Sequence, residues 1–213
     1  MSDILQQIRD AIIRRKRGEI QGLVETAVKE GIDPNGIIDN GLIAAMDVVG
    51  QQFSDSEIFV PEMLVSALTM KMGLDVVKPL LKSDNARPRG TIMMATVKGD
   101  MHDIGKNIVI MMLEGAGFQV VDLGVDLTVE KLMEQIESNK PDLVGLSALL
   151  TTTMPEMRRA VQILHERGLN EKVKVMVGGA PVSASFAEEI GADGYGADAA
   201  EAVEVARRLI SDL

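Results

Sequence analysis

The chain has 213 residues, of which 46% are hydrophobic and 25% charged, as is usual for a globular protein of one or two domains. Its net charge of −10 argues against binding to nucleic acid or to an anionic membrane surface, because either would need an excess of lysine and arginine. The absence of cysteine excludes disulfides and cysteine-ligated metals, and the lack of a signal peptide or a long apolar segment predicts a cytoplasmic protein with no membrane partner.

Residues 1–88 are predicted to form a helical domain. Apolar residues recur at every third or fourth position in the first two segments, which is the spacing of one helix face. Asp33 and Pro34 are a typical helix start, with Asp33 as the capping residue and Pro34 at the first helical position. Four helices with short connections favour a small antiparallel bundle. The expected helices contain approximately Ile4–Ile12, Ile20–Val28, Asp33–Phe53 and Val60–Leu81.

A polar segment, KSDNARPRG (residues 82–90), separates this helical pattern from the rest of the chain. It contains Pro88 and Gly90, which are typical of irregular structure. We therefore expect a linker here and a second domain that covers residues 89–213.

In this second domain, strand-like and helix-like segments alternate, which predicts an α/β fold. The segment TIMMATV, residues 91–97, is continuously apolar, as expected for a strand that is buried on both faces. We expect a flavodoxin-like (Rossmann-type), doubly wound parallel sheet of five strands in the order 2-1-3-4-5. The later strands are expected at Gln119–Leu123, Leu143–Ser147, Val173–Val177 and Gly194–Tyr195, and the helices at Gly105–Gly115, Val129–Ser138, Pro155–Arg167, Val182–Ile190 and Ala199–Leu213.

The motif KGDMHDIGKN, residues 98–107, follows the first strand, at the edge where sheets of this order bind their ligands. A phosphate-binding loop is disfavoured, because Gly99 and Gly105 are one residue too far apart and the carboxylates would repel phosphate. A second interpretation is a divalent metal held by Asp100, His102 and Asp103. A third is an ordinary loop in which Asp103 caps the following helix.

A fourth interpretation is a histidine that binds a partner through one ring nitrogen while a carboxylate holds the other. Asp100 precedes His102 by two residues and can accept a hydrogen bond from Nδ1. The partner must then bring its remaining ligands, as the metal of a macrocycle does. Aromatic residues make up only 2% of the chain, which disfavours haem, whereas a corrin with a nucleotide tail suits a slot lined by small residues.

Small residues follow three later strands and are expected at the same sheet edge as His102. They occur in GLSALLTTTMPEM (145–157), VGGAPVS (177–183) and GADGYGADAAEA (191–202). Glycine lets a backbone approach a ligand closely, although the pair Gly178-Gly179 is equally typical of a tight turn between a strand and a helix.

Together these segments resemble the cobalamin-binding region of methionine synthase and the corrinoid methyl-carrier proteins of anaerobic methyltransferase systems. The family signature D-x-H-x-x-G is present as Asp100-Met101-His102-Asp103-Ile104-Gly105. Ser147-Ala148-Leu149 and then Gly178-Gly179 follow in the order and spacing of that family. The resemblance includes the N-terminal bundle and so covers nearly the whole chain.

The resemblance implies that cobalamin, as cob(I)alamin or methylcob(III)alamin, binds with His102 as the lower axial ligand of cobalt. Asp100 would hydrogen-bond to His102, and Thr153, which occupies the position of a family serine, would complete this relay. The bundle would cover the upper face of the cofactor, although its implied residues also fit an ordinary bundle core. The other implied cofactor-binding residues are Met101, Asp103, Ile104, Gly105, Ser147, Leu149, Thr151, Gly178, Gly179, Ala180, Tyr195, Gly196, Asp198 and Ala199, with Asp39, Phe53, Val60, Met63 and Leu64 in the bundle.

The family's activity implies a shuttle that takes a methyl group from a substrate-specific methyltransferase and passes it to a second methyltransferase. A reductive activating protein is the third implied partner, and the chain is expected not to catalyse a reaction alone. Resemblance to O-demethylase carriers favours aryl methyl ethers as methyl donors and tetrahydrofolate as the acceptor. A methylamine-type carrier is the alternative, and so is a cobalamin-dependent sensor or regulator, although no DNA-binding module is evident.

Overall fold

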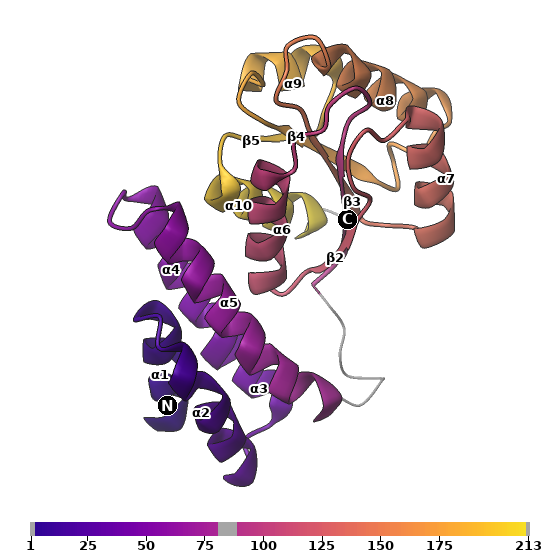
Figure 1. Ribbon diagram of the computed structural model, residues 1–213. Helices are drawn as coiled ribbons and strands as arrows, with labels where there is room; N and C mark the ends of the chain where they lie inside the picture. The colour runs from indigo at the N-terminus through magenta and orange to yellow at the C-terminus, as the bar shows by residue number, and fades with distance from the viewer. Residues whose placement is uncertain (1–2, 81–88, 212–213) are drawn as a thin grey trace. The chain divides into compact units, whose positions relative to one another are not determined.

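The computed structural model describes residues 3–80 and 89–211, which divide into a helical unit and a sheet unit (Figure 1). The predicted domain boundary between residues 88 and 89, and most of the predicted linker at 82–90, involve residues outside these described ranges. Across the described residues, none of the helices has the length and apolar character needed to span a membrane.

The helical unit is a bundle in which α2 (Arg17–Lys29) and α4 (Ala44–Ser54) each pack against both α1 (Asp3–Ile13) and α5 (Val60–Val77). A short 3-10 turn, η2 (Lys78–Leu80), follows α5, so the α-helical part ends earlier than the predicted Leu81, which itself lies outside the described residues. Most of the apolar positions predicted from the helical spacing are buried, whereas Leu23 and Val28 are partly buried. The completely buried side chains of this unit include Ile8, Ile12, Ile20, Val24, Ile37, Leu42, Val49 and Met63.

The third predicted helix begins as expected but changes pitch along its length. Oδ2 of Asp33 accepts a hydrogen bond from the backbone N–H of Gly36 at 3.1 Å, so Asp33 caps α3 (Pro34–Ile37). A π-helix, η1 (Ile38–Ile43), then joins α3 to α4 without a break. The apolar spacing does not predict this wider turn, which is rare in proteins.

The sheet unit contains a parallel five-stranded sheet in the predicted order β2-β1-β3-β4-β5. Each strand and helix lies within two residues of its predicted bounds, apart from the last two residues of the chain, which are outside the described range. The strands are β1 (Thr91–Thr96), β2 (Gln119–Asp122), β3 (Leu143–Ser147), β4 (Lys174–Gly178) and β5 (Gly194–Gly196), and the helices are α6 (Ile104–Gly115), α7 (Val129–Asn139), α8 (Met154–Glu166), α9 (Ala184–Ile190) and α10 (Ala199–Ser211).

Helices cover both faces of this sheet. α7, α8 and α9 share one buried apolar cluster with the strands, and α6 and α10 lie on the opposite face (Figure 1). In the strand register, Thr96 lies beside Ser147, and Ser147 lies beside Gly178. The loops that follow β1, β3 and β4 therefore begin next to one another at one edge of the sheet.

The core of the sheet unit can be tested at Leu164, which is completely buried in the cluster between α8 and the sheet. Replacing Leu164 with alanine should lower the free energy of unfolding by about 2–5 kcal/mol, because it removes buried methyl groups and leaves a cavity. Urea unfolding measures this change. Gln162→Ala, at an exposed position of the same helix, is the control and should change stability by less than about 0.5 kcal/mol. Equal effects of the two substitutions would contradict this assignment of the core.

Candidate functional site

The carboxylate of Asp100 is completely buried and is surrounded by hydrogen-bond donors. Its Oδ1 accepts from the backbone N–H of His102 at 3.1 Å and lies 2.7 Å from Nδ1 of the same residue. Its Oδ2 accepts from the backbone N–H groups of Leu149 at 2.7 Å and Leu150 at 3.2 Å, and from Oγ1 of Thr153 at 3.0 Å. Asp100 thus joins the loop after β1 to the loop after β3.

These donors determine the charge of Asp100. Burial alone would raise its pKa, because a buried carboxylate loses its hydration. The hydrogen bonds from Leu149, His102 and Thr153 outweigh this effect and hold the pKa of Asp100 well below its ordinary range. Asp100 is therefore ionised at neutral pH and can only accept hydrogen bonds.

The ionised carboxylate in turn sets the state of the His102 ring. Because Asp100 only accepts, Nδ1 is the donor in this contact, and the tautomer with its proton on Nδ1 leaves the lone pair on Nε2. The side chain of His102 is 51% exposed, whereas that of Asp100 is fully buried. The buried hydroxyl of Thr96 donates to the carbonyl oxygen of His102 at 2.9 Å and so fixes its backbone. The site therefore presents one oriented imidazole nitrogen at its surface.

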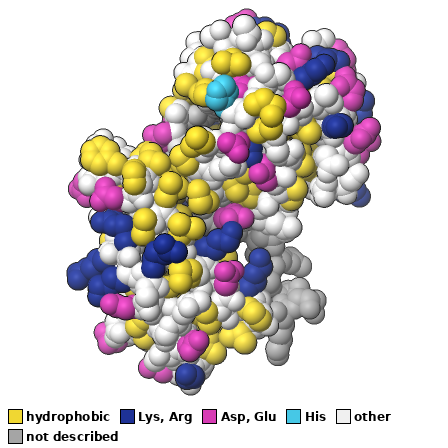
Figure 2. Space-filling model, viewed as in Figure 1, with side chains coloured by type: hydrophobic (Ala, Val, Ile, Leu, Met, Phe, Trp, Pro, Cys, Tyr) yellow, Lys and Arg dark blue, Asp and Glu magenta, His cyan; other side chains and the backbone are white. Residues whose placement is uncertain are grey.

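Four exposed apolar side chains lie either close to His102 in sequence or in the loop after β3 that binds Asp100. They are Met101, Ile104, Leu149 and Leu150, with exposed fractions between 41% and 77%. Figure 2 shows hydrophobic side chains gathered beside a histidine on the sheet unit. Gly105 adds open space, since a Cβ there would meet nothing within 4 Å. A nitrogen ligand within an apolar surface fits a large apolar group that carries its own metal.

A divalent ion held by Asp100, His102 and Asp103 does not fit this geometry. The two oxygens of Asp100 together already accept hydrogen bonds from five donors. The side chain of Asp103 is exposed and accepts a hydrogen bond from Nδ2 of Asn107 at 3.3 Å. Within residues 3–80 and 89–211, no group of three or more His, Cys, Asp or Glu side chains is arranged to hold a metal ion.

The glycines at the end of β4 are required by the backbone itself. A Cβ on Gly179 would lie 1.9 Å from the carbonyl oxygen of Ala148, and Gly179 has φ +127°. A Cβ on Gly178 would lie 2.9 Å from the carbonyl oxygen of Gly196. The tight-turn alternative is therefore supported, and the role of these glycines in lining a slot stays a prediction.

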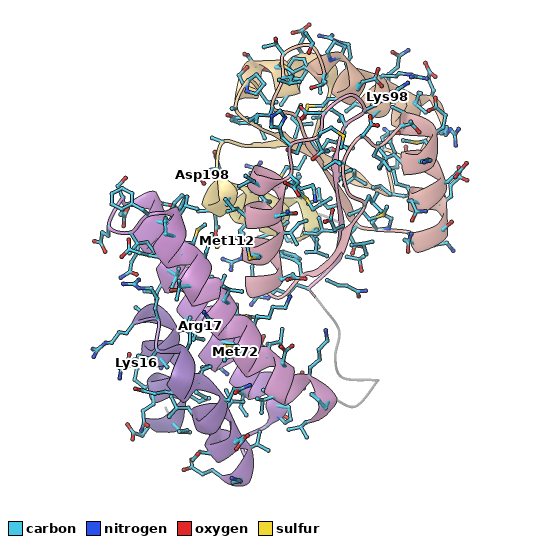
Figure 3. The ribbon with its side chains drawn as sticks, in the orientation of Figure 1. Lys16, Arg17, Met72, Lys98, Met112 and Asp198 are labelled. Atoms are coloured by element: carbon cyan, nitrogen blue, oxygen red, sulfur yellow. The ribbon has the colours of Figure 1, made fainter. Side chains whose placement is uncertain are left out.

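The other predicted residues of the sheet unit divide between surface and core. Asp198, labelled in Figure 3, caps α10, because its Oδ1 accepts from the backbone N–H groups of Ala200 and Glu201 at 2.9 Å each. Tyr195 is partly buried and packs against the apolar cluster, and Ala199 is buried. The remaining positions at this edge are Ser147, which is partly buried, and Thr151 and Ala180, which are exposed.

In the helical unit, the predicted residues differ in their exposure. Met63 is completely buried, as the bundle-core alternative predicts. Phe53, Val60 and Leu64 are partly buried, and Asp39 is exposed on η1. Their role toward a cofactor stays a prediction.

Two contributors to the site, Thr96 and Leu150, were not predicted from the sequence. Thr96 carried a signal that could have been used, because a hydroxyl inside a continuously apolar strand needs a partner. Leu150 carried none, because it contributes its backbone N–H, which every residue except proline offers.

Comparison with known proteins matches the B12 binding domain family in both units, at residues 90–204 and at residues 4–78. Dimethylamine corrinoid protein 1 of Methanosarcina acetivorans is 41% identical over 210 residues, which cover 98% of each chain. Two solved structures are also similar over nearly the whole of this chain. A cobalamin-binding protein from Desulfitobacterium hafniense DCB-2 has 32% identity and a TM-score of 0.84, covering 98% of this chain and 99% of that one.

A chain of the methanol:cobalamin methyltransferase complex from Methanosarcina barkeri has 31% identity and a TM-score of 0.87, covering 100% of this chain and 81% of that one. The B12 binding domain match alone extends over more than half of the sequence. The oriented histidine, the fold and these relatives agree, and the chain belongs to the cobalamin-binding corrinoid proteins that serve as methyl carriers in methyltransferase systems.

Proposed function

We propose that this protein binds cobalamin through Nε2 of His102 and carries methyl groups from a methylamine methyltransferase to a second methyltransferase. The observation that supports this most strongly is the 2.7 Å contact between Nδ1 of His102 and the buried carboxylate of Asp100. This contact orients the ring and fixes its tautomer, as the hydrogen-bonded partners of metal-binding histidines do.

The residues present fit a corrinoid. Among the described residues, no group of three or more His, Cys, Asp or Glu side chains could hold a metal ion, so the site offers His102 to a metal that brings its other ligands, as the cobalt of a corrin does. When bound, cobalamin supplies a cobalt centre that accepts and releases a methyl group. His102 would hold it, Asp100 would retain the proton on Nδ1, and Met101, Ile104, Leu149 and Leu150 would exclude water from the adjoining surface.

The relatives favour the methylamine alternative over the expected aryl methyl ethers. The dimethylamine corrinoid protein is 41% identical and covers 98% of the chain, whereas the methanol complex chain is 31% identical. We therefore replace the expectation of O-demethylation with methylamine carriage, and dimethylamine is the first donor to test. A tetrahydrofolate methyltransferase and a reductive activating protein remain proposed partners. The sensor or regulator alternative has no specific observation in its favour.

Cofactor retention tests the role of His102. After reconstitution with hydroxocobalamin and desalting, the wild type should keep about one corrin per chain, and His102→Ala should lose it or show a shifted visible absorption spectrum, because the axial nitrogen is gone. His165→Ala is the matched control, since His165 is the second histidine and is exposed in the last turn of α8. If the His102→Ala protein keeps its corrin with the wild-type spectrum, His102 is not a ligand of cobalt.

The hydroxyl of Thr153 can be tested against that of Thr151 in the same loop. Thr153 is 6% exposed and its Oγ1 lies 3.0 Å from Asp100, with the Leu150 carbonyl as a second acceptor at 2.9 Å. Thr153→Val should lower the free energy of unfolding by about 1–3 kcal/mol, because it removes a donor from a buried carboxylate. Thr151→Val, at an exposed site, should change it by less than about 0.5 kcal/mol. Urea unfolding of the cofactor-free protein distinguishes the two, and equal effects would exclude Thr153 from the relay.

Methyl-donor choice can be measured by incubating the reduced, reconstituted protein with separate methyltransferases and following the corrin spectrum. Methylation with a dimethylamine methyltransferase should be faster by about tenfold or more than with an aryl methyl ether demethylase, a difference of roughly 1.4 kcal/mol in activation free energy. Methanol methyltransferase serves as a third donor system. Faster methylation from the aryl methyl ether would restore the original expectation.

A further inference from the structure

Lys106 is a buried lysine in the first turn of α6, only 2% exposed. Buried lysines are rare unless they are paired, because an unpaired ammonium loses its hydration without compensation. Nζ of Lys106 donates to Oδ1 of Asp122 at 2.5 Å and to Oδ1 of Asn107 at 3.0 Å. The same oxygen of Asp122 accepts from the backbone N–H of Gly124 at 2.9 Å. Lys106 therefore fixes the beginning of the loop between β2 and α7, residues 123–128, which we call the β2–α7 loop.

The same loop holds the segment that precedes His102. Oδ1 of Asp126 accepts from the backbone N–H of Gly99 at 2.7 Å, and the backbone N–H of Asp126 donates to the carbonyl oxygen of Asp100 at 3.0 Å. Gly124 accepts from the backbone N–H of Thr96 at 3.0 Å. The β2–α7 loop thus contacts Thr96 at the end of β1 and also Gly99 and Asp100, which precede His102.

The backbone of Asp126 has an unusual conformation. Its φ is +53°, in the left-handed region that aspartate and asparagine tolerate better than most residues. Gly99 also has a positive φ, +82°. Asp126 thus donates through its backbone N–H and accepts through its carboxylate at a segment that also turns through a positive φ, at Gly99.

We propose that the β2–α7 loop is a clamp that positions His102, with Asp126 as the positioning residue and the Lys106–Asp122 ion pair as its anchor. This inference rests on the proposed function, because it assigns the clamp a role in how His102 meets cobalt. The loop between β3 and α8, residues 148–153, binds the carboxylate of Asp100. Asp126 binds the backbone carbonyl oxygen of Asp100. The direction of the His102 ring depends on both contacts, together with the Thr96 hydroxyl that holds the His102 carbonyl oxygen.

The test separates the hydrogen bond of Asp126 from its backbone conformation. Asp126→Gly removes the carboxylate but adopts a positive φ without strain, whereas Asp126→Asn tolerates that φ and keeps a side-chain oxygen for Gly99. Lys106→Met removes the charge and keeps a long unbranched side chain. Lys131→Met, at an exposed position of α7, is the matched control for loss of a lysine. Urea unfolding of each variant shows whether it folds.

Two readouts report on the ring itself. Without cofactor, ¹⁵N chemical shifts of His102 should show one tautomer, protonated at Nδ1, in the wild type and a mixture in Asp126→Gly and Lys106→Met. With cob(II)alamin, electron paramagnetic resonance should show nitrogen hyperfine splitting from His102, and the ratio of His-bound to unbound cobalt should fall about tenfold in the same two variants. Asp126→Asn and Lys131→Met should match the wild type in both measurements.

A folded Asp126→Gly protein with the wild-type tautomer and hyperfine pattern would overturn the clamp. If Lys106→Met does not fold, the comparison of Asp126→Gly with Asp126→Asn still decides. If the wild type does not retain a corrin, the proposed function fails, and the tautomer measurement on the cofactor-free protein still tests the clamp by itself.

Discussion

A buried negative charge, the carboxylate of Asp100, is the constraint on which the site depends. An ionised group inside a protein is tolerated only when hydrogen bonds replace its lost hydration. Asp100 obtains five such bonds, and they come from two different loops. The loops after β1 and β3 must therefore lie close together in one arrangement, and the His102 ring is oriented as part of the same arrangement.

Much of the sheet unit could be predicted because its order follows from local patterns. Buried parallel strands give continuous apolar runs, and the regular alternation with helices leaves few possible topologies. The topology then places the residues after β1, β3 and β4 at one edge. The pairing of Asp100 with His102 followed from their two-residue spacing, whereas the link to Thr153 came from the resemblance to the corrinoid carriers. The cap at Asp33 was equally local, since it uses a side chain and a backbone N–H three residues apart.

The parts that could not be predicted depend on contacts between distant segments. The contact between Asp126 and Gly99 joins residues 27 apart, and neither residue carries a pattern that identifies the other. Lys106 lies within the motif KGDMHDIGKN, but its side chain is buried and bonded to Asp122, so it is not available to a ligand. The π-helix of the bundle could not be predicted either, because apolar spacing does not encode its wider pitch.

Leu149 and Leu150 have a consequence for how this family can diversify. Their backbone N–H groups bind Asp100, while their side chains are 43% and 41% exposed. The main chain thus does the positioning, and the side chains stay exposed at the surface beside it. Either side chain can therefore be replaced without removing a hydrogen bond from the charge that orients the histidine.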